Sequence, residues 1–106
     1  MRETIVQPQG RLETSAVPAL ERDLQSACRP GNERVLVDLS RVSYLGSMAI
    51  RALLTAARRM AATGGSMAIL ADGDIAGVFV NAGLDTVLPV HRTLAAAQAA
   101  LRSTVP

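Results

Sequence analysis

Apolar residues along the chain recur in two kinds of block, one typical of strands and one typical of helices. Residues 34–39 (RVLVDL) and 66–70 (SMAIL) are short apolar runs of the kind that is buried on both faces of a parallel sheet. Between such runs, apolar residues return every three or four positions, as they do on one face of a helix. The predicted order is β-α-β-α-β-α-β-α. Because parallel strands need crossover connections, this order predicts an α/β fold with a mostly parallel, four- to five-stranded sheet and alternating helices.

The first quarter of the chain predicts a strand followed by a helix. Residues 3–12 (ETIVQPQGRL) are extended, and Pro8 lacks the amide hydrogen that a central strand needs, so this strand should lie at an edge or be irregular. A helix is predicted over residues 15–28, with the hydroxyl of Thr14 or Ser15 as its cap and Pro18 in its first turn. Its inward positions are Val17, Leu20, Leu24, Ala27 and Cys28.

The second helix, predicted over residues 47–62, has the clearest periodicity. Residues 42–45 (VSYL) continue extended up to Gly46, which supplies backbone freedom where the strand ends. Ser47 follows at the first turn, and the simplest interpretation is that its hydroxyl caps the helix. The predicted inward stripe is Ile50, Leu53, Leu54, Ala57, Met60 and Ala61, and the outward face is Arg51, Thr55, Arg58 and Arg59.

Two further helices and an edge strand are predicted in the rest of the chain. A helix within residues 71–83 is capped by Asp72 or Asp74 and closed by Gly83, and residues 84–90 (LDTVLPV) predict an edge strand because of Pro89. Thr93 is the predicted cap of the last helix. The inward positions are Ile75, Val78, Phe79 and Ala82 in the third helix and Leu94, Ala97 and Leu101 in the last.

Length and composition narrow the class of protein. The 106 residues suit a single small domain over residues 1–106, and a core of small aliphatic side chains follows from having only two aromatic residues, Tyr44 and Phe79. A net charge of +2 with scattered arginines argues against a nucleic-acid surface. The lone Cys28 excludes an internal disulfide and a Cys-based zinc site. Without an apolar run of about 18 residues, we expect no direct membrane insertion and a reduced, cytoplasmic compartment.

Catalytic groups are scarce, which argues against an enzyme. His91 is the only histidine, and its neighbours carry no acid, so we interpret it as a turn histidine near a helix start. Asp72 and Asp74 flank a glycine as in a calcium loop, but the following residues offer no oxygen ligands, and helix capping explains both acids better. The chain has no phosphate-binding loop and no lysine, which argues against an ATPase, a kinase or a Schiff-base enzyme. We therefore predict no cofactor and no metal.

Ser47 permits a functional interpretation beside the helix cap. Its hydroxyl would be exposed at the carboxyl end of a strand, where binding sites collect in α/β sheets. A phosphate attached there would meet the positive end of the helix and its free amides, beside Arg51. The residue pattern alone leaves both interpretations open.

Four segments carry a resemblance to a known family. They are residues 10–24 (GRLETSAVPALERDL), 34–60 (RVLVDLSRVSYLGSMAIRALLTAARRM), 64–70 (GGSMAIL) and 82–101 (AGLDTVLPVHRTLAAAQAAL). In this order they resemble the STAS domain of bacterial anti-sigma factor antagonists, from Gly10 to Leu101. The family's hallmark is a strand like LDLSGV followed by Asp-Ser-Ser/Thr-Gly-Leu at the start of a helix, and residues 37–50 (VDLSRVSYLGSMAI) fit that frame.

The resemblance assigns the family's phosphorylated serine to Ser47. It also implies three departures around that serine: Gly46 stands for the acid of the family pattern, Met48 for the second Ser or Thr, and Ala49 for the glycine. Glu13 stands for an aspartate near the first helix, with the charge kept. The chain has room for one strand before Gly10, where the family usually has two.

The function that the resemblance implies is a partner switch. The unmodified protein would bind an anti-sigma serine kinase and so free a sigma factor, and phosphorylation of Ser47, with ATP and magnesium held on the kinase, would break the complex. The implied partner-binding residues are Glu13, Thr14, Tyr44, Gly46, Ser47, Met48 and Arg51.

Two other functions stay open. One is a STAS docking subunit of a transporter or signalling complex without phosphorylation, which the altered motif favours. The other is a small-molecule pocket lined by Met48, Val78 and Phe79, for which core packing is an equal explanation. We expect a monomer or a weak dimer.

Overall fold

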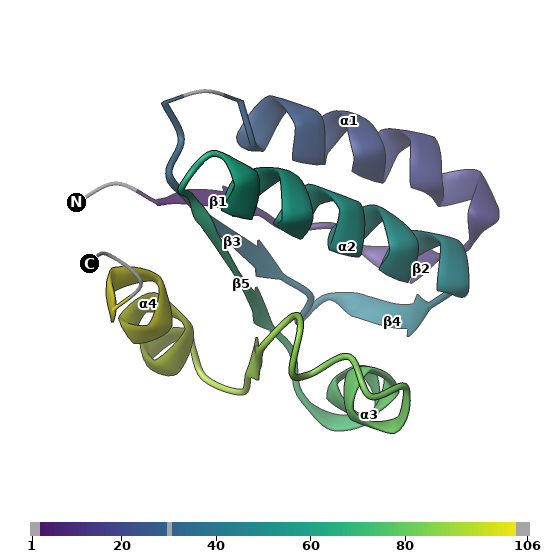
Figure 1. The fold of residues 1–106 in the computed structure, drawn as a ribbon. Helices are drawn as coiled ribbons and strands as arrows, with labels where there is room; N and C mark the ends of the chain where they lie inside the picture. Colours follow the sequence, from purple (N-terminus) through teal and green to yellow (C-terminus); the bar gives the residue numbers. More distant parts are fainter. Residues whose placement is uncertain (1–2, 30, 104–106) are drawn as a thin grey trace.

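The computed structural model describes residues 3–29 and 31–103, which form a four-stranded parallel sheet, a separate two-stranded parallel ribbon and four α-helices (Figure 1). The sheet has the strand order β1-β3-β5-β6, and the ribbon pairs β2 with β4. The bounds along the chain are β1 Thr4–Val6, β2 Gly10–Leu12, a 3-10 turn Thr14–Ala16, α1 Val17–Ala27, β3 Arg34–Asp38, β4 Val42–Leu45, α2 Ser47–Ala62, β5 Ser66–Leu70, α3 Gly73–Asn81, β6 Val90–His91 and α4 Leu94–Ser103. The predicted fold class is confirmed.

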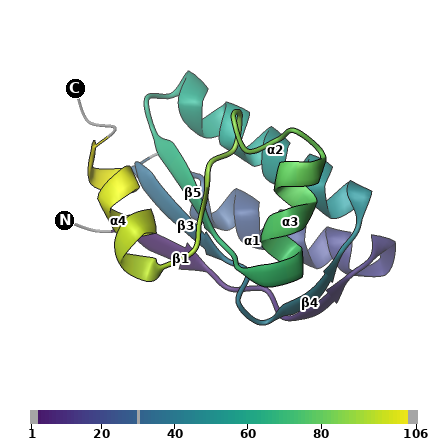
Figure 2. The same ribbon diagram turned by 90° about the horizontal axis from the view of Figure 1, so that it is seen from below.

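The helices cover both faces of the sheet. In Figures 1 and 2, α1 and α2 lie side by side on one face, α4 covers the other, and α3 lies beside β4. Alternate residues of β3 divide between two cores: Val35 and Val37 join the larger one with α1 and α2, and Leu36 packs with Ala97 and Leu101 of α4. The predicted burial of this strand on both faces is confirmed.

The N-terminal extended segment is two strands separated by Pro8. β1 lies at the sheet edge, paired in parallel with β3 alone, and β2 leaves the sheet to pair with β4. The predicted edge position and irregularity are therefore confirmed. Helix α1 carries no side-chain cap, so the predicted role of Thr14 or Ser15 is wrong. Both residues lie inside the 3-10 turn, and the N-cap position is occupied by Ala16, whose side chain cannot accept a hydrogen bond.

Helix α2 begins and ends where predicted, but its buried face includes alanines that were not predicted to be buried. Ala49, Ala52 and Ala56 are buried beside Leu53 and Met60, whereas Ala61 is exposed, contrary to the prediction. Because α2 packs against the sheet and also against α1, the buried arc is wider than one stripe, and small side chains let the two helices approach closely. The predicted outward residues are all exposed: Arg51, Thr55, Arg58 and Arg59.

The predicted strand over residues 84–90 is mostly a turn. The amides of Val87 and Leu88 donate to the carbonyl of Leu84, which draws the segment into a coil and buries Leu88. Only β6 is extended, at the sheet edge as predicted. The caps of the flanking helices are confirmed, since the carboxylate of Asp72 accepts from Gly73 (2.7 Å) and the hydroxyl of Thr93 accepts from Ala96 (3.1 Å).

Near the C-terminus, the predicted burial of Ala82 and Leu94 and the predicted turn position of His91 are wrong. Ala82 is exposed because it follows the last residue of α3, and Ala76 takes its place in the core. Leu94, the first residue of α4, is 48% exposed. His91 lies in β6, where its carbonyl accepts from Ala71 (3.0 Å) and its buried Nε2 has no hydrogen-bond partner among the described residues.

Candidate partner-binding site around Ser47

Ser47 is the first residue of α2 and stands directly after the carboxyl end of β4. Its side chain is exposed, and its hydroxyl forms no hydrogen bond within the part of the chain that the structure describes. The residue in the N-cap position is Gly46, with extended backbone angles (φ −80°, ψ 165°), and its carbonyl accepts from the amide of Ile50 (3.1 Å). The predicted capping role of Ser47 is therefore wrong, because a capping side chain acts from one position earlier.

Gly46 lies in close contact with β2. Its amide donates to the carbonyl of Leu12 (3.0 Å), and a Cβ built on it would lie 3.2 Å from that oxygen and 3.5 Å from Cε2 of Tyr44. Its φ angle is open to any residue, so the requirement for glycine comes from space and not from backbone strain. Any larger residue at position 46 requires β2 to shift by a few tenths of an ångström.

The β2–β4 ribbon brings the two predicted partner-binding segments together. Leu12 pairs with Leu45 in parallel register, so Glu13 and Thr14, which follow β2, lie at the same end of the ribbon as residues 46–48. The backbone of Glu13 comes within 4.0 Å of a Cβ built on Gly46. Residues about 33 positions apart in the sequence thus share one end of the molecule because both strands run in the same direction.

Arg11 links two of the predicted site residues, and sequence reasoning missed it. Its Nε donates to Oε1 of Glu13 (2.8 Å), and its guanidinium carbon lies 4.6 Å from the centre of the Tyr44 ring. Arg11 and Tyr44 are also register partners across the ribbon. The only sequence signal for this role is that both residues occupy outward positions of short strands, and the register was needed to connect them.

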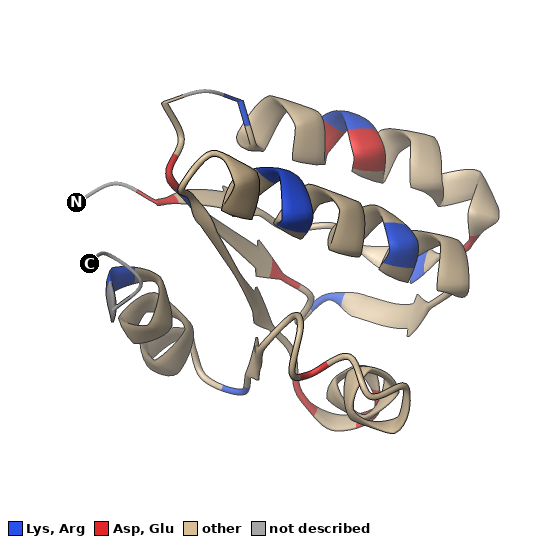
Figure 3. Ribbon diagram, in the orientation of Figure 1, with Lys and Arg blue, Asp and Glu red and all other residues tan. Residues whose placement is uncertain are grey.

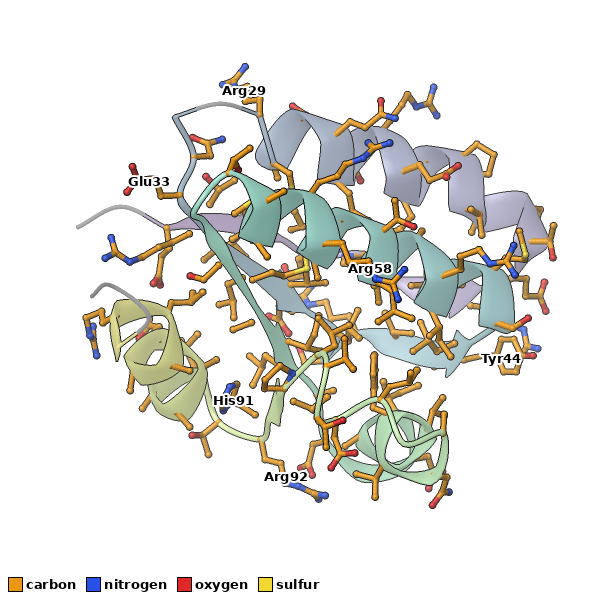
Figure 4. The ribbon with its side chains drawn as sticks, viewed as in Figure 1. Arg29, Glu33, Tyr44, Arg58, His91 and Arg92 are labelled. Atoms are coloured by element: carbon orange, nitrogen blue, oxygen red, sulfur yellow. The ribbon has the colours of Figure 1, made fainter. Side chains whose placement is uncertain are left out.

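Large apolar side chains flank Ser47 at the surface. Tyr44 is 44% exposed and Met48 is 43% exposed, and Figure 4 shows Tyr44 at the end of the molecule where β4 meets α2. Arg51 is exposed one helical turn after Ser47. No acidic residue stands in the first turn of α2, so the positive end of the helix dipole is not neutralised by its own sequence. The surface thus combines apolar contact area with positive charge.

The three residues of the predicted small-molecule pocket lie in different environments. Phe79 is fully buried in the core, Val78 packs against that core, and Met48 points to the surface. Three open pockets, with volumes of about 570, 150 and 490 Å³, are lined by described residues of other segments, and none of the predicted partner-binding residues lines them. Core packing accounts for Val78 and Phe79. Around Ser47 the side chains of Tyr44 and Met48 form an exposed surface.

The described residues contain neither a cluster of metal-binding side chains nor a membrane-spanning helix. Residues 3–29 and 31–103 hold no group of three or more His, Cys, Asp or Glu side chains that could bind a metal ion. Within the same residues, every helix is too short or too polar to cross a membrane. What the site offers is a hydroxyl, exposed apolar side chains and arginine, which are groups suited to contact with another protein.

Comparison with known proteins identifies the family. The family model of the STAS domain matches residues 2–97, and the chain therefore belongs to the STAS domain family. A protein of Bordetella bronchiseptica named as the anti-sigma factor antagonist BtrV is 27% identical over 99 residues, which cover 92% of this chain and 85% of that protein. The resemblance stated from the sequence is confirmed.

Solved structures share the fold. An anti-sigma factor antagonist from Mycobacterium paratuberculosis superposes with a TM-score of 0.87 at 25% identity, over 94% of this chain and 86% of that one. The phosphorylated form of the Bacillus cell fate determinant SpoIIAA gives 0.68 at 19% identity, over 92% and 90% of the two chains. The STAS domain of a SulP transporter from Vibrio cholerae gives 0.71 at 16% identity, over 97% and 83%. The last two likenesses establish the fold alone.

Proposed function

We propose that this STAS domain is a cytoplasmic anti-sigma factor antagonist that acts on transcription by partner switching. In its unmodified form it binds an anti-sigma serine kinase and thereby frees a sigma factor. The observation that carries the proposal is the exposed hydroxyl of Ser47, which has no hydrogen bond in the described part of the chain and is flanked by the exposed side chains of Tyr44 and Met48. The relatives from Bordetella and Mycobacterium that are named anti-sigma factor antagonists support it.

The switch itself is a phosphoryl transfer to Ser47. The Ser47 oxygen attacks the γ-phosphorus of an ATP held with magnesium on the kinase, the bond to the β-phosphate oxygen breaks, and ADP leaves while the hydroxyl proton passes to a base of the kinase. The product carries nearly two negative charges at the start of α2. Since the free amides and the dipole of α2 are favourable to an anion there, the phosphate is accommodated without rearrangement of the helix. Its charge and bulk then disrupt the interface on which Ser47 lies.

The proposed contact surface consists of two adjoining segments. The first is the loop and helix start, and the second follows β2 and is held against the first by the Gly46–Leu12 hydrogen bond and the Arg11 contacts. The residues are Glu13, Thr14, Tyr44, Gly46, Ser47, Met48 and Arg51.

The test measures affinity for the anti-sigma kinase encoded by the same organism, with serine variants of the full chain. Ser47→Asp is expected to weaken binding and Ser47→Ala to retain it. Ser26→Asp, at an exposed position of α1, is the matched control for an added charge and is expected to bind like the unmodified protein. Equal affinity of Ser47→Asp and Ser47→Ala would contradict the switch.

A constitutive docking subunit of a transporter or signalling complex is the second candidate, and one observation favours it. The site lacks the acid of the family motif, and Gly46 has little space for a side chain against Leu12. Incubation with the kinase, ATP and magnesium separates the two candidates. The partner switch predicts that the intact mass rises by one phosphate and that Ser47→Ala abolishes the gain, whereas an unmodified Ser47 favours the docking subunit.

A further inference from the structure

Helix α2 carries an exposed stripe that starts beside Ser47 and continues well beyond it. Met48, Arg51, Thr55 and Arg58 follow one another at spacings of three, four and three residues, which places them on one face of the helix. All four are exposed, and Figure 4 shows Arg58 projecting from α2 on the side away from α1. From Met48 to Arg58 the stripe is about 15 Å long at the helical rise of about 1.5 Å per residue. We call these four residues the α2 stripe.

The positive charge of the α2 stripe has no counterpart within the described part of the chain. The two ion pairs that form there join Arg11 to Glu13 and Arg92 to Asp72, and neither involves Arg51 or Arg58. Helix α2 contains no Asp or Glu at all, and Figure 3 shows it with basic segments only, whereas α1 next to it carries both signs. Arg59 borders the stripe on the side of α1, where it lines a pocket together with Thr55 and Cys28.

The arginines of the α2 stripe have no acidic neighbour on their own helix. Helix α2 has no acid in its first turn, and Arg51 stands in the second turn, beyond the turn on which the helix dipole mainly acts. A negatively charged partner would neutralise the arginines and the positive helix end together.

We infer that the α2 stripe docks an acidic surface of the kinase, an inference that rests on the proposed function. An apolar pocket of the partner receives Met48, and two carboxylates separated by about 10 Å, which is seven residues of helical rise, pair with Arg51 and Arg58. The stripe carries two arginines, with Arg59 at its border, and begins with an apolar side chain. So few positive charges beside an apolar side chain suit a protein surface better than a phosphate backbone, which requires several phosphates to be neutralised.

The same stripe explains how a phosphate on Ser47 releases the partner. Ser47 and Arg51 are four residues apart and lie next to each other on α2, so the phosphate pairs with the guanidinium of Arg51 in its own chain. Arg51 is then no longer available to the partner's carboxylate, and the phosphate repels that carboxylate as well. Arg58, almost two turns further on, is outside the reach of the phosphate and keeps its contact.

The experiment measures the dissociation constant of the full chain and the cognate anti-sigma kinase at low and at physiological salt. Arg58→Glu is expected to weaken binding about tenfold or more, and the salt dependence of the remaining binding becomes shallower. The matched control is Arg22→Glu, the same charge change at an exposed position of α1, which is expected to stay within about twofold of the unmodified protein. Because Arg58 is exposed, its variant should fold, and circular dichroism verifies this.

The outcomes separate the inference from the function on which it rests. No binding of the unmodified chain to the kinase rejects the proposed function. Tight binding of the unmodified chain together with unchanged binding of Arg58→Glu rejects the acidic docking surface and leaves the partner switch standing. Binding of a short DNA duplex that Arg58→Glu abolishes also overturns the inference, since it identifies the stripe as a nucleic-acid surface.

A second measurement examines the release step. In Arg51→Ala the phosphate on Ser47 lacks its intramolecular partner, so phosphorylation is expected to lower kinase affinity by a smaller factor than it does in the unmodified chain. An equal factor in the two proteins would reject the role of Arg51 in release.

Discussion

The amide of Gly46 donates a 3.0 Å hydrogen bond to the carbonyl of Leu12, and this bond fastens the residue before Ser47 to strand β2. The contact leaves little room for a side chain at position 46. A Cβ at position 46 would stand 3.2 Å from the Leu12 oxygen, closer than ordinary van der Waals contact. A side chain at position 46 would therefore act on the backbone of β2 as well as on the motif around Ser47.

A pair of substitutions at position 46 tests this contact. Gly46→Ala is expected to lower the free energy of unfolding by about 1–2 kcal/mol, because the methyl group crowds β2 and alanine is a poor N-cap residue. Gly46→Asp is expected to lose less, since its carboxylate can accept from the free amides of α2. Urea denaturation of the two variants measures the difference. Two equally stable variants would show that β2 yields without cost.

The contact of Arg11 with the Tyr44 ring, at 4.6 Å from the guanidinium carbon to the ring centre, gives a second prediction. A double-mutant cycle with Arg11→Ala and Tyr44→Ala should give a coupling energy of about 0.5–1 kcal/mol, as for exposed cation–π pairs. Tyr44→Phe keeps the ring and serves as the control, so its coupling to Arg11 should match that of the unmodified residue. A coupling of zero would mean that the ring does not hold Arg11 beside Glu13.

Asp38, at the end of β3, gives a prediction about pH. Partial burial raises the pKa of Asp38, but hydrogen bonds from Ser40 and Gln7 and the charge of Arg41 outweigh it, and the pKa is lowered from its ordinary value of 3.8. The Gln7 amide lies 2.8 Å from the carboxylate. A group with a lowered folded-state pKa stabilises the fold above its unfolded-state pKa, and this stability is lost as pH falls through the folded-state pKa.

The measurement for Asp38 is the urea midpoint from about pH 5 down to about pH 2, because this linkage acts from around the unfolded-state pKa downward. The unmodified protein should lose stability toward acid, and Asp38→Asn should lose less over the same range, although it starts from a lower value at the upper end. Parallel curves for the two proteins would show that other carboxylates carry the acid sensitivity.

The guanidinium of Arg34 crosses from β3 to the last turn of α4, where its Nε donates to the carbonyl of Leu101 (3.1 Å). Arg34 is 9% exposed, so Arg34→Leu should cost about 1–3 kcal/mol through the loss of a charge-assisted hydrogen bond to a helix carbonyl. Hydrogen exchange should speed up first in the amides of α4, while the amides of α2 stay protected. Arg34→Lys keeps the charge but not the planar donor, and it should fall between the two proteins.

The sequence predicted the features of the site that depend on local residue patterns, and it missed the contacts that depend on tertiary structure. The end of a strand and the start of a helix within residues 44–48 could be predicted because a strand exit followed by a strong helical period is a local signal. Arg11 was missed because its contact with Tyr44 depends on the register of β2 and β4, which no local pattern specifies. The capping role given to Ser47 was wrong by one residue, since glycine itself occupies the N-cap position.

The fold departs from prediction where packing overrides local preference. Ala52 and Ala56 carry little hydrophobic signal, and they are buried because α1 packs against them. Residues 84–90 have the β-branched and proline content of an edge strand, but Leu84 and Leu88 close a turn that buries Leu88 instead. In both segments, packing against neighbouring elements determines which residues are buried, and a short stretch of sequence does not specify those neighbours.

The first turn of α2 contains no acidic residue, and this leads to a last prediction. It separates the effect of a charge at position 47 on the stability of the protein from its effect on partner binding. Ser47→Asp places a negative charge at the positive end of the helix and should raise the free energy of unfolding by about 0.3–1 kcal/mol. Ser47→Asn has the same shape without the charge and should show less of this gain. Thermal unfolding at low and high salt measures both, and the gain of Ser47→Asp should shrink as salt screens the charge. If Ser47→Asp were less stable than the unmodified protein, its loss of partner binding could no longer be attributed to the interface, because partial unfolding of α2 would explain it equally well.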